Sequence, residues 1–359
     1  MLIVQDPHPV SPMSVASQSE ESQPRTSRSP MLSARRESTL LRMTIARRYI
    51  VDAQASGTYH VVSRCVRRAL LCGRDPLTGR DFSHRKNWIE KRIFALAARF
   101  AIGIYAYAVM SNHVHLVIQT NPASADAWDA VDVLRRWFSV SRRAGDTEAT
   151  IEARAQASAG NEARIAEYRA RLASLSWFMR FLNESIARAA NVEDGCTGRF
   201  WEGRFRCQAL LDEAAVLSAM TYVDLNPVRA GNVATPEAAE HVSFRRRSDD
   251  MRRRAPDEPL STVAGAGPAL GVSAREYLLL VDETGRLLHA GKPGAIDRSL
   301  PSVVKRLGLS ENAWLLQVRG TQSHYWRAIG LVDAMVDKAA ELGQRWLKGL
   351  AFARRLETI

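Results

Sequence analysis

Apolar and polar residues alternate in short segments of the N-terminal half of the chain, which is the pattern of half-buried β-strands. Residues 58–64 (TYHVVSR) alternate in this way and are rich in β-branched side chains. Residues 102–109 and 113–119 are two further apolar segments, and only a short polar turn at Ser111 and Asn112 separates them. The pattern therefore predicts three strands, of which the second and third pair as a hairpin.

Apolar residues recur at helical spacing in two longer segments, residues 87–100 and 165–191. Residues 204–211 then predict a fourth strand. Asp212 follows as a suitable N-cap for a helix that extends to about Ala230, and the next residue is a glycine. The order strand, helix, strand, strand, helix, strand predicts an α+β fold of the ferredoxin-like/RRM-like split βαβ type. Its antiparallel four-stranded sheet would carry helices on one face and leave the other face to a ligand or a further helix.

The rest of the chain differs in composition from this patterned part. Residues 1–44 are rich in Ser, Pro, Arg and Gln, which predicts a disordered basic arm. Because Met43 precedes the first patterned segment, a start of translation there is a further hypothesis. Residues 122–166 are rich in Ala, Arg and Glu and predict a helical insertion within a domain that spans residues 45–235.

Chain breakers and charges mark residues 236–267 as a basic linker between two domains. This linker contains two arginine triplets, at 245–247 and 252–254, which are either solvated or bind phosphates without sequence preference. Residues 268–359 predict a small, mostly helical C-terminal accessory domain. Its expected elements are a short β unit at 277–288 and helices at 300–309 and 326–355.

The composition adds a partner to this picture. The 359 residues are 46% hydrophobic, which allows a substantial core, and the net charge is +12. A chain this basic concentrates polyanions at its surface, so nucleic acid is the first candidate partner. No apolar run approaches the ~18 residues of a membrane span, and no segment has the order of a signal peptide. The four cysteines form no CxxC pair, which predicts reduced thiols in a cytoplasmic protein.

A pair of histidines in the third predicted strand is the first candidate for chemistry. Side chains alternate between the two faces of a strand, so His113 and His115 point the same way while Val114 points to the other face. Two imidazoles in this arrangement can chelate one divalent cation. Taken alone, such a pair in a strand is more often incidental.

The second candidate lies on the last helix of the same domain. Tyr222 and Asn226 are four residues apart, so they lie on one helix face, one turn from each other. A tyrosine hydroxyl can attack phosphorus, and an amide oxygen can complete a three-ligand metal site. Taken alone, a half-buried tyrosine and a helix-ending asparagine before Pro227 explain the same residues.

Four segments taken together resemble one family, the HUH single-tyrosine transposases. The likeness is to the REP-associated tyrosine transposases of the insertion-sequence-200 superfamily, and it covers about residues 45–235. The segments that carry it are YHVVSR at 59–64, MSNHVHLVI at 110–118, GRFWEGRFR at 198–206 and YVDLNPVRA at 222–230.

The resemblance implies a role for each residue of the two candidates. His113, His115 and Asn226 would be the ligands of Mg²⁺ or Mn²⁺ in an HUH endonuclease domain, and Tyr222 would be the nucleophile. Single-stranded, hairpin or palindromic DNA would be cleaved and rejoined through a 5′-phosphotyrosine intermediate. The protein would be cytoplasmic, associated with the bacterial nucleoid when bound, and a monomer or homodimer.

Basic and aromatic residues flank the first and fourth strands. The arginines are candidates for phosphate contacts, and Phe200, Trp201 and Phe205 either stack on unpaired bases or belong to the core. The predicted DNA-binding set consists of Arg64, Arg67, Arg68, Arg199, Arg204 and Arg206.

Several alternatives remain at this point. A domesticated protein that binds palindromes without cutting them would also fit, although all four site positions carry competent residues. A histidine-based hydrolase would call for a third strand histidine, and residue 117 is valine. Tyr168 is a second possible nucleophile. Residues 302–314 have a faint helix-turn-helix pattern with Gly308 at the turn, which would suit accessory binding to duplex DNA.

Overall fold

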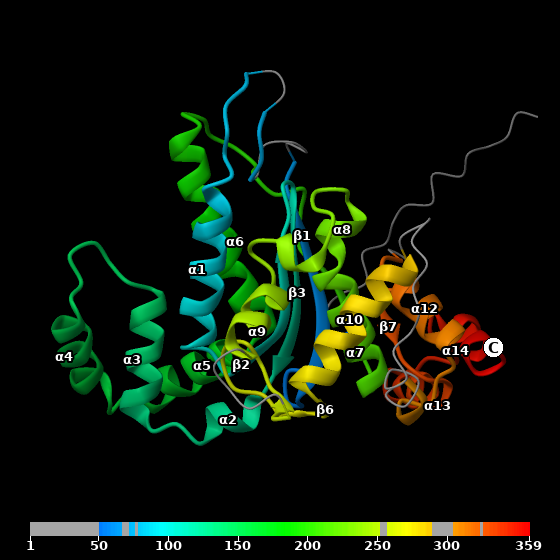
Figure 1. The fold of residues 1–359 in the computed structure, drawn as a ribbon. Coiled ribbons are helices and arrows are strands. Elements are labelled where there is room, and N and C mark those ends of the chain that lie inside the picture. The colour runs from blue at the N-terminus through cyan, green and yellow to red at the C-terminus, as the bar shows by residue number, and fades with distance from the viewer. Residues whose placement is uncertain (1–49, 67–71, 76–77, 252–256, 289–303, 324–325) are drawn as a thin grey trace, which may run out of the picture. The chain divides into compact units, whose positions relative to one another are not determined.

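The computed structural model describes residues 50–66, 72–75, 78–251, 257–288, 304–323 and 326–359. The predicted N-terminal arm and the second arginine triplet lie outside the described residues. Within them the fold is α+β, with a five-stranded sheet in the order β2-β3-β1-β4-β7 (Figure 1). The strands of this sheet are β1 (Gly57–Arg64), β2 (Ile102–Val109), β3 (His113–Thr120), β4 (Arg206–Leu210) and β7 (Ala328–Ile329).

The first four strands pair in the order of a split βαβ sheet. β3 pairs antiparallel with both β2 and β1, and β1 pairs antiparallel with β4. The predicted hairpin of β2 and β3 is therefore confirmed, and so are the four strands, within one or two residues at their ends. β7 lies parallel to β4 and adds a fifth strand that the sequence pattern did not predict.

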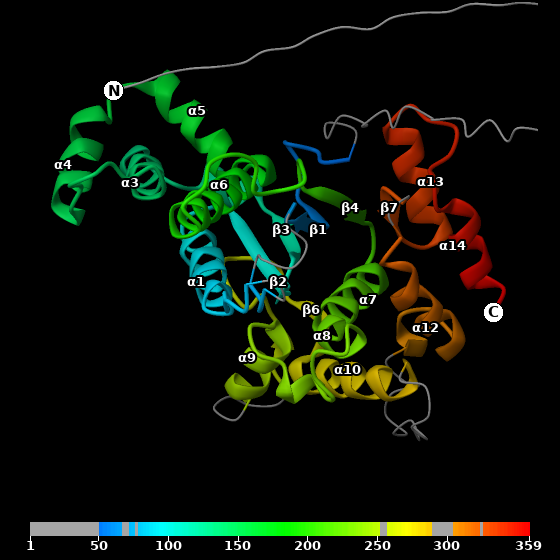
Figure 2. The ribbon, with the colours of Figure 1, turned by 90° about the horizontal axis from the view of Figure 1, so that it is seen from above.

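Two helices cover one face of the sheet, as the sequence predicts. They are α1 (Arg85–Ala97) and α6 (Leu175–Glu193), which lie on the same side of the strands in Figures 1 and 2. Alternate strand residues such as Val61 and Leu116 point into this layer and pack with apolar residues of both helices. This layer is the larger hydrophobic core.

A second helical layer covers the opposite face. Its central helix is α7 (Glu213–Asp224), which contacts the four antiparallel strands and is followed by the short α8 (Asn226–Arg229). Asp212 caps α7 as predicted, since its Oδ1 accepts a hydrogen bond of 2.8 Å from Ala215 N. Pro227, which lacks an N–H, lies just beyond the break between α7 and α8 at Leu225, and Gly231 follows with a φ of +70°.

The insertion is helical, as expected. It contains α2 (Pro122–Asp126), α3 (Ala130–Val140), α4 (Glu148–Ser158) and α5 (Glu162–Leu172). The segment predicted as one helix, 165–191, is divided between two helices, α5 and α6. They separate where the Leu172 carbonyl accepts a hydrogen bond from Ala101 N and the backbone of Ser174 is extended.

The segment after α8, predicted as a basic linker, contains secondary structure that packs against the sheet. After a 3-10 turn (Pro236–Ala238), it contains α9 (Ser243–Met251), and Val242 and Ala264 form bridges with β2. The first arginine triplet is also only partly solvated. Arg247 is buried and donates a hydrogen bond of 2.7 Å to the Tyr105 carbonyl. Apolar and hydrogen-bonding positions between the charges thus hold this segment against the sheet.

Two predictions for the C-terminal part are wrong. The segment predicted as a β unit is the helix α10 (Ala274–Leu288), which follows the two-stranded ribbon of β5 (Pro259–Leu260) and β6 (Leu270–Ser273). Ser273 and Glu276 exchange hydrogen bonds between side chain and backbone, a capping box that the sequence S-x-x-E at 273–276 already contained.

The long helix predicted over 326–355 is also wrong. That segment contains β7, α13 (Val332–Glu341) and α14 (Leu350–Glu357), and two glycines with positive φ, Gly343 and Gly349, lie between the two helices. The described part of the helix-turn-helix pattern has its turn at Gly308 and continues as α12 (Glu311–Gly320). All four cysteines are described, and none is in a disulfide bond. No helix among the described residues is long and apolar enough to cross a membrane.

Candidate active site

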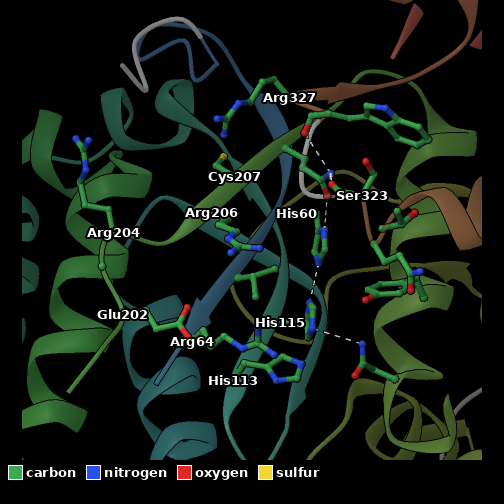
Figure 3. Close-up of a pocket in the computed structure, with 18 of the residues that line it drawn as sticks. His60, Arg64, His113, His115, Glu202, Arg204, Arg206, Cys207, Ser323 and Arg327 are labelled. Atoms are coloured by element: carbon green, nitrogen blue, oxygen red, sulfur yellow. Dashed lines mark hydrogen bonds between the residues drawn. The ribbon is translucent and has the colours of Figure 1, made fainter. Parts of the chain in front are cut away.

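The four residues predicted as the site from two distant parts of the sequence line a single cavity. It lies between the sheet and α7 and has a volume of about 650 Å³ (Figure 3). His113 and His115 reach it from β3, Tyr222 from α7 and Asn226 from α8. Strand pairing and helix packing therefore bring together groups that are more than a hundred residues apart.

Strand alternation explains the position of the two histidines. His113 and His115 point to the α7 side of β3, while Val114 and Leu116 are buried in the core beneath α1 and α6. Their rings lie 4.7 Å apart, centroid to centroid, in an edge-on arrangement. The same-face prediction for the pair is confirmed.

Helical spacing explains the other half. Tyr222 and Asn226 face the histidines from successive turns, as predicted. The Tyr222 ring lies 5.6 Å from the His115 ring, and Asn226 Nδ2 donates to His115 Nε2 over 3.4 Å. Tyr222 is only 8% exposed, and the Arg229 guanidinium lies 4.9 Å above its ring. The phenol is thus held at the wall of the cavity beside a cationic group.

A third histidine, which the sequence pattern did not single out, belongs to this site. The ring of His60 of β1 lies edge to edge with the His115 ring and nearly parallel to it, with 5.2 Å between the centroids, and its Nε2 lies 2.9 Å from His115 Nδ1. Its other nitrogen, Nδ1, lies 2.8 Å from Gln208 Oε1 of β4. A signal was available, because His60 and Arg64 are four apart in a strand and must share a face, and Arg64 was already a candidate.

Burial keeps the three imidazoles neutral. It lowers the pKa of His60 to about 4. Burial, with the nearby Arg64, also lowers the pKa of His113 to about 4. The pKa of His115 is held well below its usual value by burial and then by the two neighbouring histidines. Burial raises the pKa of Tyr222, and Arg229 partly opposes this. At neutral pH the site therefore offers imidazole lone pairs and a protonated phenol.

These residues fit a divalent cation. The amide oxygen is a ligand type that suits Mg²⁺ or Mn²⁺, and neutral imidazoles suit first-row transition metals, so of these two ions the set fits Mn²⁺ better. Two adjacent ligands of an octahedral ion with bonds of about 2.1 Å are ~3 Å apart, close to the 3.4 Å between the Asn226 amide and His115 Nε2. The amide would turn by half a rotation to present its oxygen. The described residues contain no metal-binding group of three His, Cys, Asp or Glu, so a cation here depends on the amide.

Only some of the predicted DNA-binding arginines line the cavity. Arg64, Arg204 and Arg206 line the cavity, whereas Arg199 is exposed outside it. The remaining two, Arg67 and Arg68, lie outside the described residues. Two lining arginines were missed by the sequence analysis, Arg229 in the segment NPVRA and Arg327 in the C-terminal part.

The aromatic residues near β4 belong to the core. Phe200, Trp201 and Phe205 are each at most 9% exposed and pack in the layer with α1 and α6, where they are not available to stack on bases. Trp326 of the C-terminal part lines the cavity instead and lies against Phe352.

The alternative nucleophile lies elsewhere. Tyr168 stacks on Trp137 within the helical insertion, with 4.7 Å between the ring centroids, and does not line the cavity.

Comparison with solved structures finds one described as a REP-associated tyrosine transposase bound to a REP hairpin. The alignment covers 65% of this chain and 96% of that chain, with 16% sequence identity and a TM-score of 0.36. A TM-score of this size supports no inference about fold or function, so the function proposed below depends on the residues of the cavity. No family model matches the sequence, and no curated protein is similar to it.

Proposed function

We propose that this protein is a metal-dependent DNA transposase or nickase that cleaves and rejoins single-stranded or hairpin DNA through Tyr222. The observation that carries the proposal is the convergence of the tyrosine, two histidines and one amide on one cavity. The lining arginines add the positive charge that a phosphodiester backbone requires. The motif resemblance to the HUH single-tyrosine transposases supports the same assignment.

The proposed reaction is a transesterification at a phosphodiester. The Tyr222 oxygen attacks phosphorus and loses its proton to solvent, the P–O3′ bond breaks, and the departing 3′ oxygen takes up a proton. The product is a 5′-phosphotyrosine and a free 3′-hydroxyl. Attack of a 3′-hydroxyl on the phosphotyrosine then reforms a phosphodiester and releases Tyr222, so no nucleotide cofactor is consumed.

Each residue of the cavity has a part in this scheme. His113, His115 and Asn226 would hold Mg²⁺ or Mn²⁺, which supplies positive charge to a scissile phosphate. Arg229, whose guanidinium lies 4.9 Å above the Tyr222 ring, favours the phenolate. Arg64, Arg204 and Arg206 bind the neighbouring phosphates and fix the strand in the cavity.

A covalent adduct tests the proposal. The full chain is incubated with Mn²⁺ and a hairpin oligonucleotide taken from the DNA flanking its gene, and the products are separated under denaturing conditions. We expect a covalent protein–DNA species whose formation is abolished in Tyr222→Phe, while DNA affinity is nearly unchanged. Tyr168→Phe is the matched control and should form as much adduct as the unmodified protein. An equal yield of adduct from Tyr222→Phe would place the nucleophile elsewhere.

A binding protein without strand transfer is the second candidate. The burial of Tyr222 and its raised pKa favour this candidate, because neither prepares the phenol for attack. Tight binding of the flanking hairpin with no adduct in Mn²⁺ would support it over the enzyme.

A further inference from the structure

A row of three hydrogen-bonded side chains begins at His115 and reaches the C-terminal part of the chain. His115 contacts His60, His60 contacts Gln208, and Gln208 Nε2 donates to the Ser323 carbonyl at 2.8 Å and the Trp326 carbonyl at 3.2 Å (Figure 3). All three side chains are at most 8% exposed. Residues 323 and 326 lie beyond the part of the chain that resembles the transposases.

The two carbonyls fix the direction of the amide in this chain. A carbonyl oxygen can only accept, so the Gln208 NH₂ group must face Ser323 and Trp326. The Gln208 oxygen must then face His60. An oxygen at 2.8 Å requires a donor, and therefore His60 Nδ1 carries a proton.

The His60 and His115 rings are buried, and Glu202 is the one acidic side chain among the described residues that line the cavity. A buried charge without a partner is costly, so each ring is neutral and carries one proton. With its proton on Nδ1, His60 can only accept at Nε2. His115 Nδ1 must therefore donate to it over the 2.9 Å contact. The remaining nitrogen of His115, Nε2, has no proton and faces Asn226.

We propose that Gln208 and His60 are positioning residues that hold His115 as the Nδ1–H tautomer, so that its Nε2 offers a lone pair to a cation. Histidine in water favours the opposite tautomer, and the hydrogen bond at one ring nitrogen decides which is present. A metal-binding histidine is commonly oriented by such a donated hydrogen bond at its other nitrogen. Here the orientation originates at the backbone carbonyls of Ser323 and Trp326, so the C-terminal part supports the site. The assignment of His115 as a ligand rests on the proposed function, but its tautomer does not.

Nitrogen NMR of the metal-free full chain, with ¹⁵N-labelled histidine, reads the tautomer directly. Signals are assigned by single histidine-to-glutamine variants. We expect protonated Nδ1 and unprotonated Nε2 for His115. In Gln208→Leu the signal should move toward protonated Nε2, and the affinity for Mn²⁺ alone should fall by about 10- to 100-fold.

Gln119→Leu is the matched control. Gln119 is a buried glutamine of β3, 7% exposed, whose side chain contacts Thr58 and not the histidines. It should change neither the tautomer nor Mn²⁺ affinity, which separates the proposed role from a general loss of packing. Protonated Nε2 in the unmodified protein, or an unchanged tautomer in a folded Gln208→Leu variant, would overturn the proposal. The expected tautomers without any DNA adduct would support this inference and count against the transposase.

Discussion

Asp224 is a fully buried carboxylate on α7 that lies two residues from both Tyr222 and Asn226. It accepts hydrogen bonds from Phe244 N at 2.8 Å and from the hydroxyls of Ser243 and Tyr277 at 2.5 Å each. Burial raises the pKa of Asp224, and these hydrogen bonds oppose the shift. One side chain thus ties the end of α7 to α9 and α10. The positions of Tyr222, the proposed nucleophile, and of Asn226 both depend on this helix end.

Removal of this carboxylate should destabilise the protein strongly. Asp224→Ala leaves three buried donors without their acceptor, and we expect the free energy of unfolding to fall by about 3 kcal/mol. Urea unfolding of the full chain measures the change. Asp282→Ala, which breaks an exposed pair with Arg286 on α10, should cost no more than about 0.5 kcal/mol. Similar losses of unfolding free energy for the two variants would show that the hydrogen bonds of Asp224 do not stabilise the fold.

At the scale of elements, the start of α7 is joined to the strand β7. Asp212 Oδ1 caps α7, and its Oδ2 accepts a hydrogen bond of 2.6 Å from Leu331 N, just after β7. Gly330 fits beside this carboxylate because an added Cβ would come within 2.8 Å of Oδ2. The helix that carries Tyr222 and the strand that extends the sheet are therefore held by the same side chain.

This double contact predicts a larger effect than that of an ordinary cap. Asp212→Ala removes a cap worth about 1 kcal/mol and a further hydrogen bond of similar size, so we expect a loss of about 2 kcal/mol. Asp129 caps α3 at 2.7 Å from an exposed position, and Asp129→Ala should cost only about 1 kcal/mol. Denaturant unfolding of the two variants compares them. Equal losses would mean that the contact with Leu331 contributes nothing.

For the whole molecule, the net charge is +12, and arginines from five different segments line the cavity at which we propose that DNA binds. These segments are β1, the loop before β4, β4 itself, α8 and the residue just before β7. These arginines are Arg64, Arg204, Arg206, Arg229 and Arg327.

Binding of single-stranded DNA should therefore weaken as salt rises. Each phosphate contact on a single strand contributes about 0.7 to the slope of log affinity against log salt. We expect Arg206→Ala and Arg327→Ala each to reduce this slope by about that amount in fluorescence anisotropy titrations over a potassium chloride series. Arg164→Ala, an exposed position on α5, is the control and should leave the slope unchanged. No reduction for either cavity variant would place the DNA elsewhere.

Local patterns predicted the main strands of the fold and one pair of the residues that line the cavity. The strands β1 to β4, the hairpin and the cap at Asp212 follow from alternation and capping within a few residues. The common face of His113 and His115 follows in the same way. The C-terminal elements were missed because β7 has only two residues and glycines interrupt the apolar pattern, and the capping box before α10 went unnoticed.

The sequence by itself determined which residue types lie on which face of each strand and helix, because periodicity is a local property of the backbone. Only the tertiary structure decided that β3, β1, β4 and α7 meet at one cavity, that His60 and Gln208 lie behind His115, and that a segment near residue 326 closes its wall. Those contacts join residues separated by 55 to 148 positions. They form through packing and strand pairing, which no local pattern encodes.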